Sequence, residues 1–152
     1  FRNQMFLSMA CAYAEAIGAN TVFHGATLVD SLAGYWDGSE EFREHFQTLI
    51  SLNRTNEIKL ECPLLHMDKK TIVEYCAGSR VDLKHTYTCY SGEEKSDAST
   101  PSSALRIKGF AEAGFIDPIP YKQDLTEYWA ENNCKPFPVD EVFADRYGTR
   151  GP

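Results

Sequence analysis

The chain has 152 residues, of which 43% are hydrophobic and 24% are charged, and its formal net charge is −7. This balance is typical of a single globular domain and excludes disordered, collagen-like and coiled-coil proteins. No apolar run approaches the roughly 18 residues that cross a membrane, and the acidic charge disfavours a broad nucleic-acid-binding surface.

The first predicted element is a helix over residues 4–17, where apolar side chains recur at spacings of three and four. We expect this helix to bury a wide face made of Phe6, Met9, Ala10, Tyr13 and Ile17. Gly18 stands where a helix commonly ends on glycine. The β-branched and aromatic residues that follow predict a buried strand over 21–25.

Residues 26–39 form a predicted loop beyond the carboxyl end of that strand, where open α/β sheets bind ligands. A second helix is predicted over 40–52 with Ser39 as its N-cap, and a short strand over 58–60. Helices and strands that alternate in this way predict an α/β fold.

The remaining predicted elements are helices, separated by a long polar loop over 86–104. We expect one helix over 69–76, one over 104–113 capped by Ser102 or Ser103, and a short one over 124–132. The predicted organisation is an α/β domain over 1–117, followed by an irregular proline-containing tail over 118–152.

The five cysteines are odd in number, and no two are spaced as a CxxC pair. We therefore expect reduced thiols in a cytoplasmic protein, with no disulfide framework.

Five short segments stand in a fixed order along residues 2–117. The first segment is Arg2-Asn3 with the alanine-rich helix that follows, and the second runs from His24-Gly25 through Asp30, Gly34-Tyr35 and Asp37 to Glu41-Phe42. The third is Pro63-Leu64-Leu65-His66 with Lys69, the fourth is Thr88-Cys89-Tyr90-Ser91-Gly92, and the fifth is Leu105-Arg106 with Gly109-Phe110. Together these segments resemble the 7-cyano-7-deazaguanine synthases, the QueC family.

The resemblance implies part of a doubly wound parallel sheet of the nucleotide-binding pyrophosphatase type, the adenine nucleotide alpha hydrolase-like fold. Members of the family are ligases that convert 7-carboxy-7-deazaguanine and ammonia into the nitrile in queuosine or related 7-deazaguanine pathways, some of them in phages. They use ATP and magnesium, and they carry a structural zinc bound by four cysteines.

The resemblance also implies roles for individual residues. Lys69 corresponds to a catalytic lysine that neutralises an acyl-adenylate or pyrophosphate, and the substrate-binding positions fall on Arg2, Asp30, Tyr35 and Asp37. For each we also keep a structural alternative: aspartates form turns in glycine-rich loops, loop aromatics such as Tyr35 pack at edges, and Arg2 lies on the surface.

Two departures from the family concern its bound groups. No serine-glycine-glycine phosphate loop occurs in the 152 residues, so we expect no ATP binding by this chain alone. Counted from Cys89, the other three zinc positions fall on Asp97, Thr100 and Ser103, so we expect the metal to be lost.

We therefore expect the chain to be the carboxyl-terminal portion of a QueC-like enzyme, inactive by itself. Another chain or a homodimer partner would complete it, and its small-molecule ligand would be a 7-deazapurine. One alternative is a non-catalytic, decayed family member kept as a binding or structural subunit. A related ligase acting on another substrate is a further alternative.

Overall fold

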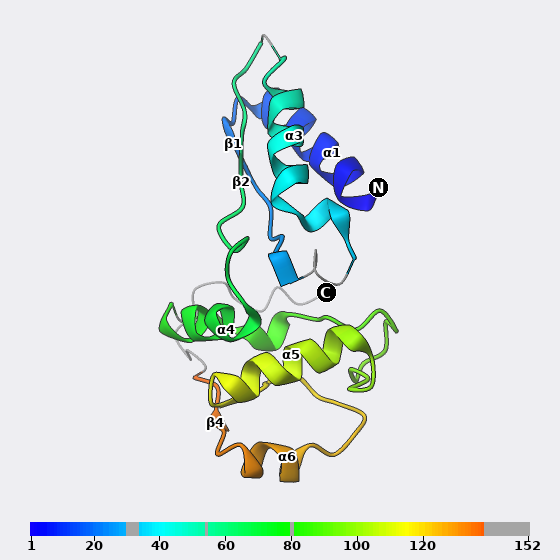
Figure 1. Cartoon of the computed structure of the whole chain (residues 1–152), viewed down its shortest axis with the longest axis vertical. Helices are drawn as coiled ribbons and strands as arrows, with labels where there is room; N and C mark the ends of the chain where they lie inside the picture. Colours follow the sequence, from blue (N-terminus) through cyan, green and yellow to red (C-terminus); the bar gives the residue numbers. More distant parts are fainter. Residues whose placement is uncertain (30–33, 54, 80, 139–152) are drawn as a thin grey trace, which may run out of the picture. The chain divides into compact units, whose positions relative to one another are not determined.

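The computed structural model describes residues 1–29, 34–53, 55–79 and 81–138. The chain divides into two compact units, Phe1–Asp68 and Lys69–Pro152. Each combines helices with a pair of short parallel strands (Figure 1), which confirms the α/β class. No helix in the described ranges is long and apolar enough to span a membrane.

The first unit begins with helix α1, Arg2–Ile17, which ends at Gly18 in the left-handed conformation (φ 71°). Glycine adopts this conformation without a steric penalty, so the predicted helix and its end are both confirmed. The 3₁₀ turn η1, Trp36–Gly38, leads into helix α3, Glu40–Ile50. The Ser39 hydroxyl caps α3 as predicted, because it accepts a hydrogen bond from the N–H of the third helical residue.

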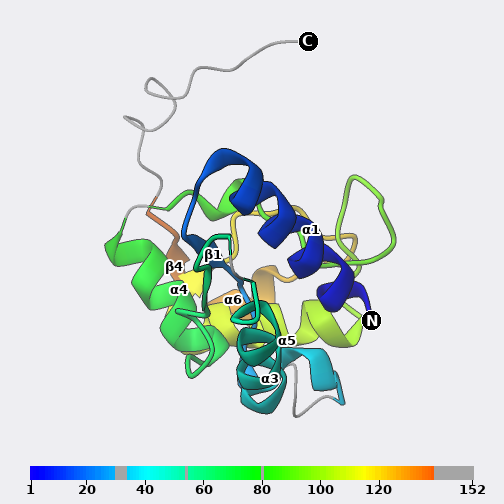
Figure 2. The same ribbon diagram turned by 90° about the horizontal axis from the view of Figure 1, so that it is seen from above.

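A two-stranded parallel sheet joins strand β1, Thr21–Phe23, to strand β2, Lys59–Glu61. Val22 lies opposite Leu60, and both side chains are buried. Helices α1 and α3 lie on one side of this pair (Figure 1), and Figure 2 shows them from above. The core between helices and sheet consists of Leu7, Cys11, Ala14, Val22, Phe46, Ile58 and Leu60.

The predicted buried face of α1 is wrong. Helix α1 packs on β1 through Leu7, Cys11 and Ala14, which form a neighbouring face of the helix. The expected core residues Phe6, Met9, Tyr13 and Ile17 are instead 59% to 67% exposed, and of the predicted face Ala10 packs against the core while partly buried. Because α1 carries apolar side chains on both faces, the periodicity alone could not tell which face the sheet covers.

In its described residues, 69–79 and 81–138, the second unit contains three α-helices and a second parallel strand pair. Its elements are α4 (Lys69–Gly78), the 3₁₀ turn η2 (Leu83–His85), α5 (Pro101–Glu112), β3 (Phe115–Ile116), α6 (Thr126–Glu131) and β4 (Lys135–Pro136). Helices α4 and α5 pack closely, since a Cβ added at Gly109 would lie 2.6 Å from the Cβ of Lys69. This contact requires glycine, because no larger residue fits at that separation.

Helix α5 begins three residues earlier than predicted. Its N-cap is Thr100, whose hydroxyl accepts a hydrogen bond from the Ser103 N–H, and Pro101 occupies the first helical position. Ser102 and Ser103, the predicted caps, therefore lie inside the helix. Proline is favoured at the first position because its missing N–H has no partner there in any helix.

Residues 118–138 contribute to the core of the second unit. The predicted short helix is confirmed as α6, which buries Trp129, and β4 pairs in parallel with β3. Phe137 packs edge-to-face against Phe110 and Phe115. These contacts tie the segment after Pro118 to α5, although the sequence indicated an irregular tail.

Candidate functional site

In the first unit, two of the segments noted in the sequence meet in space. The Asn3 backbone N–H donates to Asp37 Oδ2 over 3.4 Å, and the Asn3 side-chain amide donates to the Asp37 carbonyl over 3.3 Å. Asp37 thus lies at the amino terminus of α1, where the helix dipole favours a negative charge. The contact holds η1 against the start of α1, beside Arg2.

Aromatic side chains surround this contact. The Trp36 ring packs edge-on against Phe1, at 5.7 Å between ring centroids, and against Phe42 at 5.3 Å. Tyr35 precedes η1 and remains exposed. Trp36 is thus engaged in edge packing, yet it is 51% exposed against 55% for Tyr35, so both aromatic residues are accessible to a flat heterocycle.

His24 is a neighbour of Asp37 that reasoning from the sequence missed. It follows β1 directly, and its N–H donates to the Glu61 carbonyl over 2.9 Å, which extends the parallel ladder. Burial lowers the pKa of His24, and the Asp37 charge opposes that change. The signal in the sequence was its position, because ligand-binding residues gather where a parallel strand ends.

The other predicted substrate and catalytic residues are placed unevenly. Arg2 is the first residue of α1, next to the Asn3–Asp37 contact. Asp30 lies outside the described residues. Lys69 is the first residue of α4 in the second unit, packed against Gly109 of α5. The roles predicted for these residues stay predictions.

The four degenerate zinc positions gather at the start of α5. Cys89 is buried, with its Sγ in a hydrogen bond of 3.2 Å with Ser91 Oγ. Hydrogen bonds from Ser91, from the Asp97 N–H and from the Thr100 hydroxyl lower the pKa of Cys89 to about 6. These donors favour the thiolate, which is why the pKa falls.

The donor set at these positions does not fit a zinc ion. The Thr100 hydroxyl donates to Ser103 Oγ over 2.8 Å, and Ser103 Oγ lies 3.1 Å from Ser96 Oγ. The Asp97 carboxylate is held by Ser99 and Gln123, which lower its pKa to about 2. One thiolate and two hydroxyls that bond to each other are poor partners for tetrahedral zinc, which takes cysteine or histidine.

A buried ion pair organises the carboxyl-terminal side of α5. Asp117 accepts hydrogen bonds from Arg106 Nε at 2.5 Å and Nη2 at 2.9 Å, from the Tyr121 hydroxyl at 2.7 Å and from the Ile119 N–H at 3.2 Å. Arg106 also donates to Thr86 Oγ1 over 2.8 Å. Burial and the Asp117 charge raise the pKa of Tyr121 above its usual range.

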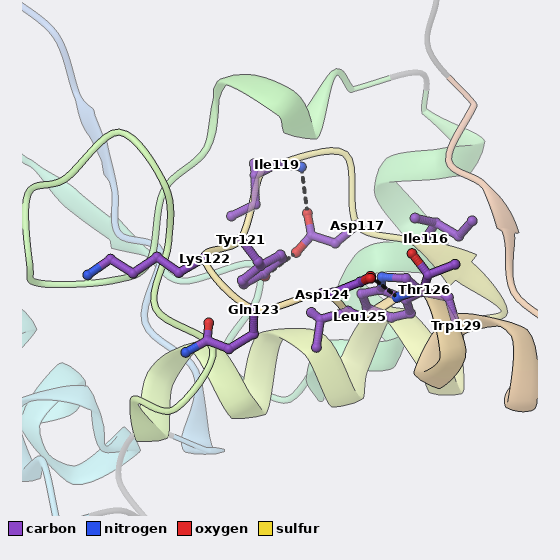
Figure 3. A pocket seen from close by; sticks show the side chains of 10 residues that line it. All are labelled: Ile116, Asp117, Ile119, Tyr121, Lys122, Gln123, Asp124, Leu125, Thr126 and Trp129. Carbon is purple, nitrogen blue, oxygen red and sulfur yellow. Dashed lines mark hydrogen bonds between the residues drawn. The ribbon is translucent and has the colours of Figure 1, made fainter.

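A cavity of about 440 Å³ lies beside this network, and Figure 3 shows the side chains that line it. Its polar side chains already have protein partners. Lys122 pairs with Glu93 over 2.6 Å, Gln123 donates to Asp97 over 3.0 Å, and Asp124 accepts from the N–H of a neighbouring residue. The cavity therefore combines these paired polar groups with the apolar side chains of Ile116, Leu125 and Trp129.

Comparison with known proteins identifies the lineage of the chain. Residues 1–114 match the family described as queuosine biosynthesis protein QueC. The chain is 37% identical over 142 residues to a 7-cyano-7-deazaguanine synthase of Thermoplasma volcanium, which covers 91% of this chain and 58% of that protein. It is 40% identical over 125 residues to one of Desulfitobacterium hafniense strain DCB-2, covering 79% and 53%.

A 7-cyano-7-deazaguanine synthase of Campylobacter hominis is 42% identical over 123 residues, covering 80% of this chain and 56% of that protein. The chain spans about half the length of the curated relatives it matches. The similarity to the Thermoplasma volcanium protein covers 91% of the chain and therefore reaches beyond residue 118.

Proposed function

Because the chain belongs to the QueC family of queuosine biosynthesis proteins, we propose that it supplies the deazapurine-binding part of a 7-cyano-7-deazaguanine synthase. In this reaction the carboxylate of 7-carboxy-7-deazaguanine attacks ATP and releases pyrophosphate, and ammonia then displaces AMP to give the amide. A second activation by ATP, at the amide oxygen, lets AMP leave and forms the nitrile.

The contact between Asn3 and Asp37 is the observation that carries this proposal. It joins two segments that resemble family motifs, 34 positions apart, next to the carboxyl end of β1. Arg2 and Asp37 bring opposite charges to this edge, and Tyr35 adds an exposed ring. A carboxylate is suited to the ring and exocyclic N–H donors of a guanine-like base, because two charge-assisted bonds reject bases without that edge.

In this proposal the matched region is the carboxyl-terminal portion of the synthase, and the preceding portion supplies the phosphate loop for ATP. Together the two portions form the doubly wound parallel sheet. Lys69 neutralises the acyl-adenylate or the leaving pyrophosphate, and the zinc of the family is replaced by hydrogen bonds around Cys89.

The rival function is that of a non-catalytic binding or structural subunit. It is favoured by the donor set around Cys89, because a loop that has lost its metal ligands is what a decayed enzyme would carry. A related ligase acting on another substrate is the third candidate. The three functions differ in whether deazaguanine binds and whether the nitrile forms.

The test is reconstitution. We would mix the chain with the separately produced portion of the Thermoplasma volcanium synthase that precedes the matched region, add ATP, magnesium, ammonia and 7-carboxy-7-deazaguanine, and measure the nitrile by mass spectrometry. Product from the mixture but from neither part alone supports the proposal. Binding of 7-carboxy-7-deazaguanine without product favours the binding subunit, and neither binding nor product refutes the proposal.

Two substitutions make the test specific. Asp30→Asn is expected to weaken 7-carboxy-7-deazaguanine binding about ten- to a hundredfold, since a charged hydrogen bond contributes about 1.5–3 kcal/mol. Asp124→Asn is the matched control, because Asp124 only accepts a hydrogen bond in a turn of the second unit. If Asp30→Asn lowers the melting temperature but leaves affinity unchanged, Asp30 is a turn former.

A further inference from the structure

His24 is a half-buried residue at the carboxyl end of β1 whose side chain has room to meet a ligand. Its backbone N–H donates to the Glu61 carbonyl over 2.9 Å and so extends the β1–β2 ladder by one residue. Because side chains alternate along a strand, the imidazole lies on the same sheet face as the buried Val22, which packs under α1 and α3. In the described ranges, no residue makes a hydrogen bond or an ion pair with this ring.

The turn η1 brings Asp37 to the same end of the sheet. This turn packs against both α1 and α3, and Figure 1 shows it at the end of the first unit where β1 finishes. Asp37 is held there by its two hydrogen bonds with Asn3. Its charge acts on the His24 ring, since it raises the pKa of His24 against the stronger effect of burial. An imidazole and a carboxylate therefore stand near each other at this edge.

A carboxylate and a neutral imidazole recognise different parts of a guanine-like edge. The carboxylate accepts hydrogen bonds from the ring N–H and the exocyclic amino group, but it cannot pair with the 6-oxo oxygen, which is itself an acceptor. A neutral imidazole has one N–H, which can donate to that oxygen. Burial favours the neutral form of His24 at neutral pH, because it lowers the pKa of this residue below the ordinary value of about 6.5.

We infer that His24 is a specificity-determining residue, which donates a hydrogen bond to the 6-oxo group of the 7-deazaguanine while Asp37 accepts from its N–H donors. The inference rests on the proposed function for the identity of the heterocycle. Together the two side chains match the order of one acceptor and two donors along this edge. A base with another order would leave a polar group at the site without a partner, which is what makes a site reject an analogue strongly.

Two ligands that differ at one atom test this contact. 7-Carboxy-7-deazaguanine has an oxygen at position 6, whereas its 6-thioxo analogue keeps both N–H donors of this edge and has sulfur, a weaker acceptor. We would titrate each compound into the chain mixed with the preceding portion of the Thermoplasma volcanium synthase, and measure both dissociation constants by calorimetry. The unsubstituted chain should bind the 6-oxo compound about three- to tenfold more tightly than the 6-thioxo compound.

Three variants make the comparison specific. His24→Leu removes the donor, so it should lose this preference and bind the two compounds within about twofold of each other. His24→Gln keeps an N–H donor and should keep most of the preference. His45→Leu is the matched control, because His45 is an 80% exposed histidine on α3 that pairs with Glu41, and it should leave both dissociation constants unchanged.

The ratio of the two dissociation constants separates recognition from a structural role. If His24 only supports the fold, His24→Leu weakens both compounds alike and keeps the preference, which overturns the inference. If the nitrile forms and His24→Leu keeps the preference, the proposed function stands and the inference is wrong. If the mixture binds the 6-oxo compound without making nitrile and His24→Leu abolishes the preference, the proposed function fails and the contact stands. Absence of binding by either compound refutes both.

Discussion

Loss of the Asp117 charge should destabilise the second unit strongly. Its carboxylate is completely buried and accepts four hydrogen bonds, two of them from the Arg106 guanidinium, which is only 11% exposed. Asp117→Asn keeps the shape of the side chain but places an amide NH₂ group, itself a donor, where Arg106 and Tyr121 already direct their hydrogen-bond donors. Breaking a buried pair in this way costs about 3–5 kcal/mol, because the remaining cation is left without its counter-charge.

Urea unfolding measures this cost. Trp129 is buried in the second unit, so its fluorescence in a Trp36→Phe background reports that unit alone. With a urea dependence of about 2 kcal/mol per molar, Asp117→Asn should lower the midpoint by about 1.5–2.5 M. Glu112→Gln is the control, since it breaks the exposed pair with Lys108 on the same helix and should cost less than about 1 kcal/mol.

The reasoning is refuted if both substitutions shift the midpoint equally. A double variant, Arg106→Met with Asp117→Leu, sharpens the result. It removes both charges, so it should be less destabilised than Asp117→Asn alone, because no uncompensated charge remains buried. A double variant that is less stable than the single one would show that the charge does not dominate at this position, and that packing or the lost hydrogen bonds to Tyr121 and Ile119 do.

Three further predictions use unfolding, followed by Trp36 fluorescence for the first unit and by Trp129 fluorescence for the second, and titration of a thiol. Gly109→Ala should lower the free energy of unfolding by about 1–3 kcal/mol, because the added Cβ would lie 2.6 Å from the Lys69 side chain. Gly78→Ala is the control and should change it by less than about 0.5 kcal/mol, because open space surrounds that position. Equal effects of the two substitutions would contradict the close contact between α4 and α5. Leu7→Ala should cost about 2–5 kcal/mol and Met9→Ala less than about 0.5 kcal/mol, and the opposite order would mean that α1 buries the other face. The absorbance of the Cys89 thiolate should rise with a midpoint near pH 6 and should be absent in Cys89→Ser, whereas a midpoint near the ordinary thiol pKa would contradict the prediction. Because the pKa of Cys89 is lower in the folded state, its ionisation stabilises the fold. This stabilisation is fully present above the ordinary thiol pKa and is lost as the pH falls through about 6.

Local chemistry in the sequence was a good guide to where helices begin and end. Gly18 ends α1 and Ser39 caps α3, since both signals act through backbone groups a few residues away. The start of α5 was misplaced because four residues with hydroxyl groups stand close together, Ser99, Thr100, Ser102 and Ser103. Pro101 was the discriminating signal, as proline fits the first helical position and points to Thr100 as the cap.

Contacts between distant segments were beyond such reasoning. Asn3 and Asp37 are 34 positions apart, and the local sequence around either residue does not predict that the two are in contact. The Arg106–Asp117 pair likewise needs both α5 and the chain after β3 to be in place. The exposed face of α1 is a further case, because the sequence of a helix with apolar residues on two faces does not indicate which face packs against the sheet.

The hydroxyl network beside Cys89 leads to a last prediction, which concerns zinc binding. Thr100 and Ser103 occupy positions that the family resemblance assigns to zinc ligands. The Thr100 hydroxyl donates to Ser103 Oγ, which also lies within hydrogen-bond distance of the fully buried Ser96. Thr100 is also the N-cap of α5, so its hydroxyl holds the loop against the helix as a metal would. These hydrogen bonds hold the positions close together.

Replacing Asp97, Thr100 and Ser103 by cysteine should restore a four-thiolate site with Cys89. We expect the triple variant to bind one zinc per chain and to give the intense charge-transfer absorbance of tetrahedral cobalt thiolates, whereas the unsubstituted chain holds no stoichiometric zinc by elemental analysis. Cys89→Ser in the triple variant is the control and should weaken binding. Zinc bound stoichiometrically by the unsubstituted chain would show that hydroxyl and carboxylate groups still serve as ligands, and a triple variant without zinc would show that the loop has drifted from the geometry of its relatives.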